Sequence, residues 1–140
     1  MSDLSLGGRP QAVDFGAKLL WVSAVITLLA TIAGRAALID VPVPGSTMVS
    51  NLITTAILAL CAWKIGAGRN WARWVFLVVW VLGSGFLALV ACFAPQALRG
   101  MSTVLVTIAV VQTALQTAAL ILTFMPASNA WFRARALEPG

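Results

Sequence analysis

Two glutamines one helical turn apart are the residues of this chain best suited to chemistry inside an apolar segment. Gln112 and Gln116 lie on the same face of any helix that contains them. An amide in hydrocarbon without a hydrogen-bonding partner is destabilised by several kcal/mol, so both side chains must contact protein or water. The sequence predicts that these groups hydrogen-bond one helix to another. The alternative is a polar site, formed together with Asn51, Thr54 or Thr55, that binds or conducts a substrate.

Basic residues beside the apolar segments form a second candidate group. Glycines before a helix start, as in Gly66 and Gly68, are typical of phosphate-binding loops, but the spacing matches neither the dinucleotide nor the Walker motif. Attraction to anionic lipid headgroups is therefore the prediction. The candidate lipid contacts are Lys64, Arg69, Arg73, Arg133 and Arg135.

The residue types needed for catalysis and metal binding are scarce. The chain has no histidine and two cysteines, and no Asp or Glu lies within its long apolar segments. A Ser-His-Asp arrangement is therefore impossible, and we expect no enzyme activity, no cofactor and no metal site. Cys61 and Cys92 should lie at opposite ends of two membrane spans, far beyond the roughly 7 Å Cα separation that a disulfide allows.

The elements that carry these residues have the length and composition of membrane helices. Of 140 residues, 61% are hydrophobic and 9% are charged, whereas soluble domains have about 25% charged residues. Successive uncharged stretches contain 16, 23, 25 and 33 residues. About 20 apolar residues in a helix cross the roughly 30 Å bilayer core, so the sequence predicts four spans.

The predicted fold is all-α: a single integral membrane domain, residues 1–140, forming an up-down four-helix bundle. The predicted spans cover roughly residues 17–38, 46–63, 70–93 and 102–124. Asn70 and Ser102 are the expected N-caps of the last two spans. After Pro126, residues 128–135 form either one or two helical turns at the membrane interface or a frayed end.

Each predicted span has a stripe of small or polar residues at helical spacing, which is typical of helix–helix contacts in membranes. We expect these stripes to point into the bundle. In order, they are Ser23, Thr27, Ala30 and Gly34; Asn51, Thr55, Ala59 and Ala62; Ser84, Ala88 and Ala91; and Ala109, Gln112, Gln116, Ala119 and Thr123.

The distribution of basic residues predicts the orientation. With four spans, seven basic residues share a side with both termini, and only Arg35 and Arg99 lie on the other side. Because Lys and Arg concentrate on cytoplasmic loops, both termini are predicted to lie in the cytoplasm. This bias also accounts for the net charge of +5 without nucleic acid as a partner.

Two motifs at the predicted cytoplasmic boundary carry a resemblance. They are Gly68-Arg69-Asn70-Trp71-Ala72-Arg73-Trp74 and Ser128-Asn129-Ala130-Trp131-Phe132-Arg133. With them, the chain resembles a family of uncharacterised small four-span proteins of the bacterial inner membrane. The resemblance implies the fold and the location but no activity. Length and span number are also similar to small multidrug-resistance transporters, whose essential glutamate in the first span is missing here.

The sequence therefore predicts a non-enzymatic accessory or structural subunit of the bacterial cytoplasmic membrane. Its expected partners are the lipid bilayer and either another membrane protein or a second copy of itself. The alternative is a small oligomeric transporter or channel with a polar site at Asn51, Gln112 and Gln116.

Overall fold

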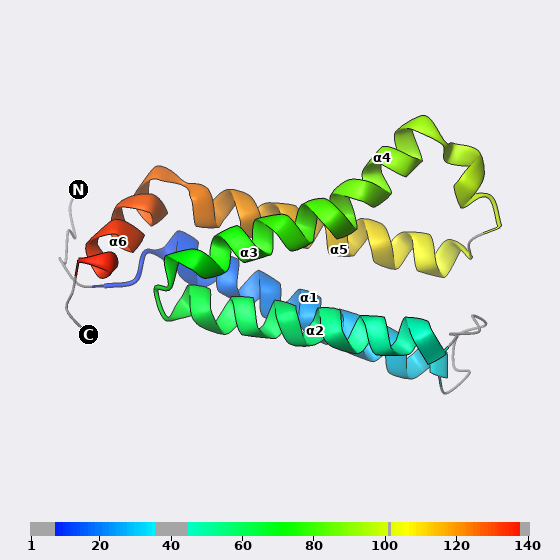
Figure 1. Cartoon of the computed structure of the whole chain (residues 1–140), viewed down its shortest axis with the longest axis horizontal. Coiled ribbons are helices and arrows are strands. Elements are labelled where there is room, and N and C mark those ends of the chain that lie inside the picture. The colour runs from blue at the N-terminus through cyan, green and yellow to red at the C-terminus, as the bar shows by residue number, and fades with distance from the viewer. Residues whose placement is uncertain (1–7, 36–44, 101, 138–140) are drawn as a thin grey trace.

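The computed structural model describes residues 8–35, 45–100 and 102–137, and every regular element within these ranges is a helix. In chain order the elements are α1 (Gln11–Arg35), α2 (Gly45–Gly66), α3 (Asn70–Trp80), the π-helix η1 (Val81–Gly85), α4 (Phe86–Phe93), the 3₁₀-helix η2 (Pro95–Leu98), α5 (Thr103–Phe124) and α6 (Pro126–Ala136). Figure 1 shows α1, α2, α3 and α5 lying along the long axis of the molecule. The prediction of an all-α fold is confirmed.

Within the described ranges, four helical segments are long and apolar enough to cross a membrane, as the composition predicts. They are Gln11–Arg35, Gly45–Gly66, Asn70–Phe93 and Thr103–Phe124. The first segment begins before the predicted residue 17, and the second extends past the predicted residue 63. Residues 36–38 of the first predicted span and the turn at 39–44 lie outside the described residues.

The two predicted N-caps have different outcomes. Ser102 caps α5, because its hydroxyl accepts a hydrogen bond from the backbone N–H of Leu105 at 3.2 Å. Asn70 is instead the first residue of α3, and Arg69 occupies the cap position without a side-chain capping bond. Gly68 explains the shift. It has a φ of 81°, a left-handed conformation that ends α2 and leaves the next residue extended before α3.

The segment after α5 is helical rather than frayed. Pro126 is at the start of α6, where its missing N–H removes no helical hydrogen bond. Side chains of α6 then satisfy the last carbonyls of α5. Ser128 Oγ donates to Leu122 O at 2.7 Å, and Asn129 Nδ2 donates to Phe124 O at 2.9 Å. These bonds fold α6 back against the bundle.

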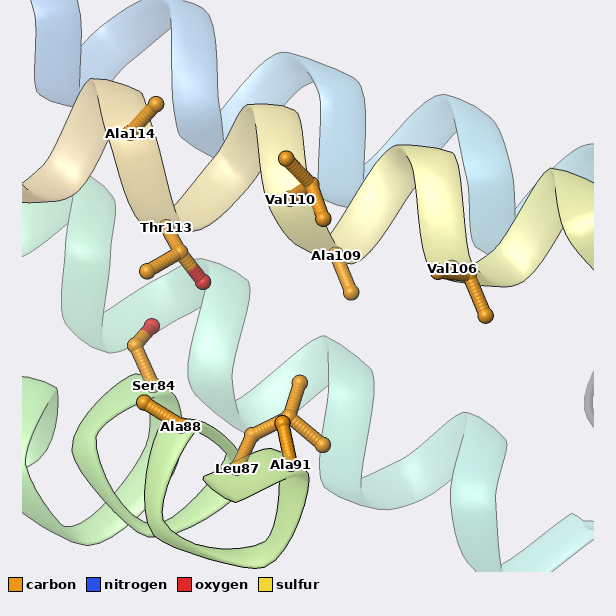
Figure 2. A pocket seen from close by; sticks show the side chains of 9 residues that line it. All are labelled: Ser84, Leu87, Ala88, Ala91, Val106, Ala109, Val110, Thr113 and Ala114. Atoms are coloured by element: carbon orange, nitrogen blue, oxygen red, sulfur yellow. The ribbon is translucent and has the colours of Figure 1, made fainter. Parts of the chain in front are cut away.

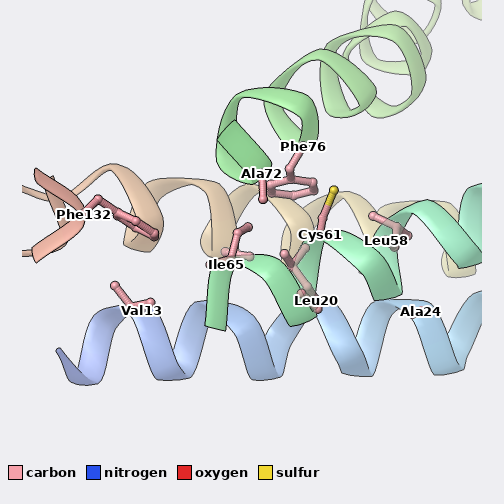
Figure 3. Close-up of a cluster of buried hydrophobic side chains, with 11 residues drawn as sticks. Val13, Leu20, Ala24, Leu58, Cys61, Ile65, Ala72, Phe76 and Phe132 are labelled. Carbon is pink, nitrogen blue, oxygen red and sulfur yellow. The ribbon is translucent and has the colours of Figure 1, made fainter. Parts of the chain in front are cut away.

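The hydrophobic core lies at the end of the bundle where α6 packs (Figure 3). Its residues come from α1, α2, α3, α5 and α6, and they are Val13, Leu20, Ala24, Leu58, Cys61, Ala62, Ile65, Ala72, Phe76, Ala119 and Phe132. Small residues bring the helices close there. A Cβ atom added at Gly16 of α1 would lie 3.1 Å from Cγ2 of the buried Thr123.

The opposite end of the bundle is open. No residue of η1 or α4 is buried, and Figure 1 shows α4 diverging from α5. The sequence Gly83-Ser84-Gly85 is the physical reason, since glycine–serine pairs and π-turns are the sites where helices kink. The stripe of Ser84, Ala88 and Ala91 was expected to pack inside the bundle. Instead, Ala88 and Ala91 are exposed, because the π-turn directs α4 away from its neighbours.

Candidate functional site

Gln112 joins α5 to α1 through both ends of its amide. Its Oε1 accepts a hydrogen bond from Ser23 Oγ at 2.5 Å, and its Nε2 donates to Thr27 Oγ1 at 2.6 Å. Ser23 is fully buried. Thr27 also donates to the carbonyl of Ser23 at 3.0 Å, so the two hydroxyls are held one turn apart, at the spacing that the amide requires.

Gln116 extends the network to the π-helix. Its Nε2 donates to Ser23 Oγ at 3.0 Å, and its Oε1 accepts from Ser84 Oγ at 2.9 Å. Three elements, α1, η1 and α5, therefore meet at one amide. The structure thus brings the two glutamines together, 3.4 Å apart from Gln116 Nε2 to Gln112 Oε1.

Asn51 and Thr55 form a separate polar contact. Asn51 Nδ2 donates to Thr31 Oγ1 of α1 at 3.2 Å, and Thr55 Oγ1 donates to the carbonyl of Asn51 at 2.8 Å. Within the described ranges neither residue hydrogen-bonds to Gln112 or Gln116. The four predicted site residues therefore lie in two groups that are linked along α1.

The hydrogen bonds of both glutamines end on protein groups. Each amide oxygen accepts at least one hydrogen bond, and each amide nitrogen donates at least one. This arrangement stabilises the contact of α1 with α5. Gln116 Nε2 uses both of its hydrogens and Gln112 Oε1 uses both of its lone pairs within the network. One hydrogen of Gln112 Nε2 and one lone pair of Gln116 Oε1 are left for a ligand.

A cavity of about 190 Å³ is lined by both glutamines. Its walls come from α2, α3, η1, α4 and α5, and its polar lining residues are Thr54, Ser84, Gln112, Thr113 and Gln116. A larger cleft of about 390 Å³ lies beside it, between α4 and α5 (Figure 2). Apart from Ser84 and Thr113, the cleft is lined by alanine, valine and leucine side chains.

Arg73 is the residue whose environment the sequence analysis missed. It was predicted to contact lipid headgroups, but its side chain is only 6% exposed. Its Nη1 donates to Thr123 O at 3.3 Å and to Asn129 Oδ1, and its Cζ lies 4.9 Å and 4.8 Å from the ring centres of Phe124 and Phe132. The guanidinium therefore links α3 to α5 and α6.

A sequence signal for this link exists in retrospect. Asn129 and Phe132 are three residues apart, so they share one face of the helix that follows Pro126. An amide oxygen and an aromatic ring on one face suit a guanidinium, which donates hydrogen bonds in its plane and stacks over rings. The partner, Arg73, is more than 50 residues away in the chain, and only the tertiary structure identifies it.

The other predicted lipid contacts lie at the same end of the molecule. Arg69, Arg133 and Arg135 are exposed, and Lys64 is partly exposed, with its Nζ 4.3 Å from the ring centre of Trp63. The α6 side chains of Trp131 and Arg135 approach Gly68 closely. The basic residues of the α2–α3 turn and of α6 thus form one surface, which keeps the prediction of headgroup contact open to test.

The two cysteines are both free thiols, with Cys61 in the core and Cys92 exposed on α4. Among the described residues, no three His, Cys, Asp or Glu side chains lie close enough to hold a metal ion.

Comparisons with known proteins do not assign this chain to a family. No protein-family model, curated protein or solved structure matches this chain.

Proposed function

We propose that this protein is a non-enzymatic subunit of a bacterial cytoplasmic membrane that binds another membrane protein or a second copy of itself. The supporting observation is the isolation of α4. This helix has its principal contacts with η1 and η2, its own neighbours in the chain. Packing between helices is a main driving force for their association in membranes, so a helix that buries no side chain within its own molecule is suited to pack against a helix of another.

The outer surface of η1 and α4 together has the spacing of a helix–helix seam. Leu82, Phe86, Leu89 and Phe93 follow one another at intervals of four, three and four residues, which keeps them on one side of a helix. Their side chains are 72%, 63%, 58% and 82% exposed. We call these four residues the outer seam, and we propose that it contacts the partner.

We further propose an up-down arrangement in the membrane with both termini in the cytoplasm. The support is the basic surface described above, which gathers the α2–α3 turn and α6 at one end of the molecule. Basic residues favour the cytoplasmic side. Alkaline phosphatase fused after Gly140 is expected to be inactive, and strong activity would contradict this orientation.

The resemblance to small four-span inner-membrane proteins agrees with this proposal in length, span number and boundary motifs. It supports the location and carries no activity to this chain.

Co-purification from mild detergent tests the proposed role. We expect a stoichiometric partner, or a disulfide-linked dimer through Cys92 after mild oxidation in membranes. Replacing Leu82 and Phe86 by alanine should abolish either result. A matched control replaces Val25 and Leu29, which are also exposed and apolar but lie on α1, and it should leave binding intact. A monomer without a partner in the native membrane would overturn the proposal.

A second candidate function is a small oligomeric transporter or channel with a polar site at Gln112 and Gln116, without the predicted Asn51, which bonds to Thr31 instead. The observation that favours it is the cavity of about 190 Å³ that is lined by both glutamines. Flux through the purified protein in liposomes would support it. Replacing Gln112 and Gln116 by leucine should then abolish flux while the protein remains folded.

A further inference from the structure

Two threonine hydroxyls differ from the other threonine hydroxyls inside the helices. Beyond the first turn of each helix, most donate to the carbonyl four residues earlier; these are Thr27, Thr31, Thr55, Thr107 and Thr117. Thr123 donates to the carbonyl three residues earlier. Thr54 and Thr113 have no side-chain hydrogen bond within the described part of the chain.

Thr54 and Thr113 line the same cavity of about 190 Å³, from α2 and α5 respectively. Each lies near the middle of its span, so both hydroxyls are roughly 15 Å from either headgroup region. A hydroxyl without a hydrogen-bonding partner is unfavourable in hydrocarbon. Two of them around one cavity therefore suit a ligand that brings a hydrogen-bonding group to the middle of the membrane.

The adjoining cleft defines the rest of that ligand. Ser84, Leu87, Ala109 and Thr113 line both the cavity and the cleft of about 390 Å³, so one molecule can occupy both. Figure 2 shows the hydroxyls of Ser84 and Thr113 at one end of the cleft, with the alanine and valine side chains beyond them. The polar end of the ligand therefore lies inside the bundle, and its apolar part lies between α4 and α5.

The lining of the cleft suits an apolar chain. Apart from Ser84 and Thr113, its walls are alanine, valine and leucine side chains. A methylene group is about as large as a water molecule, roughly 30 Å³, so a cleft of about 390 Å³ has room for roughly a dozen of them.

We propose that this cleft binds an uncharged amphipathic molecule. Its apolar chain, roughly a dozen carbons long, lies between α4 and α5, and one hydroxyl or carbonyl group hydrogen-bonds to Thr54 and Thr113. A phospholipid does not fit this description, because its charged headgroup is unfavourable at the depth of these threonines. The site is separate from the outer seam and does not depend on partner binding.

Two photoreactive probes test the proposal on the full chain in phosphatidylcholine liposomes. Both carry a diazirine on a chain of roughly a dozen carbons; one ends in a primary alcohol and the other is a plain hydrocarbon. We expect the alcohol to label peptides of α4 and α5. Replacing Thr54 and Thr113 together by valine should reduce its labelling roughly tenfold, the effect of about 1.4 kcal/mol of lost hydrogen bonding. Labelling by the hydrocarbon should not change.

Two further variants complete the design. Thr107→Val removes a hydroxyl that bonds within α5 and lies outside the cleft, so it should leave labelling unchanged. Ala88 of α4 is exposed and lines the cleft. Ala88→Leu should therefore fill the cleft and prevent labelling of the α4 and α5 peptides by both probes. Equal labelling by the two probes, or full alcohol labelling in the valine or Ala88→Leu variants, would overturn the proposal.

Discussion

At the scale of single residues, the amide of Gln112 should stabilise the contact of α1 with α5. Gln112→Leu removes the bonds to Ser23 and Thr27. Interhelical hydrogen bonds in membranes contribute about 0.6 kcal/mol on average, so we expect the free energy of unfolding to fall by about 1–2 kcal/mol. Reversible unfolding in mixed micelles of mild detergent and dodecyl sulfate measures this change.

The matched control for Gln112→Leu is Thr107→Val, which removes an exposed hydroxyl bonded to its own helix. Its effect should stay within about 0.5 kcal/mol. If Gln112→Leu is as stable as the unsubstituted protein, the glutamines do not hold the helices together. A ligand site at Gln112 and Gln116 then explains these residues better.

Arg73 should anchor α6. Arg73→Lys keeps the charge but loses the planar guanidinium that stacks between Phe124 and Phe132 and bonds to Asn129. We expect α6 to detach more often and trypsin to cleave after Arg133 at least several-fold faster. Peptide mass spectrometry in detergent follows this cleavage.

Arg69→Lys is the control for that measurement, since Arg69 is exposed and its replacement should not change the cleavage rate. Equal rates in the two variants would mean that the buried guanidinium does not hold α6 in place.

At the scale of helices, two glycines should respond in opposite ways to the addition of one methyl group. A Cβ at Gly16 would lie 3.1 Å from Thr123 Cγ2 and 3.4 Å from Ala119 O, whereas a Cβ at Gly83 would have no atom within 4 Å. Thr123 is fully buried, so an added methyl group would have to displace a packed side chain. We expect Gly16→Ala to separate α1 from α5 and to destabilise the fold by about 1–3 kcal/mol.

Gly83→Ala should be neutral or stabilising by up to about 1 kcal/mol, because alanine favours a helix and the space is open. Thermal unfolding of both variants in the same detergent makes the comparison. A loss of stability for Gly83→Ala that equals the loss for Gly16→Ala would contradict the packing difference between the two ends of the bundle.

At the scale of the whole molecule, the difference in packing between the two ends of the bundle should appear in the reactivity of the two thiols. Cys61 is 1% exposed in the core at the end where α6 packs, and Cys92 is exposed on α4 at the open end. A maleimide reagent should therefore modify Cys92 in the folded, detergent-solubilised protein and should modify Cys61 only after denaturation. Intact-mass measurement before and after denaturation counts the modified thiols, and equal rates for both would show that the two halves are packed alike.

Some features followed from the chain alone because they depend on local composition. The uncharged stretches predict helices long enough to cross a membrane, the spacing of Gln112 and Gln116 puts both amides on one face, and Ser102 caps its helix. Each of these outcomes needs only helical geometry and the chemistry of neighbouring residues. The sequence also identified small residues that line the helices, including Ser23 and Thr27.

The tertiary structure decided which of these residues meet and how tightly the helices pack. Local spacing does not reveal that Arg73 is buried against Asn129, since that contact joins segments distant in the chain. The sequence also did not predict that α4 diverges from α5, because Gly83-Ser84-Gly85 is compatible with a straight helix or a kinked one. In the folded protein this sequence forms the π-turn Val81–Gly85, and the cleft lies between α4 and α5. The sequence alone thus determined the helices and the residues on each face. Which residues contact one another, and the open end of the bundle, depend on how the helices assemble.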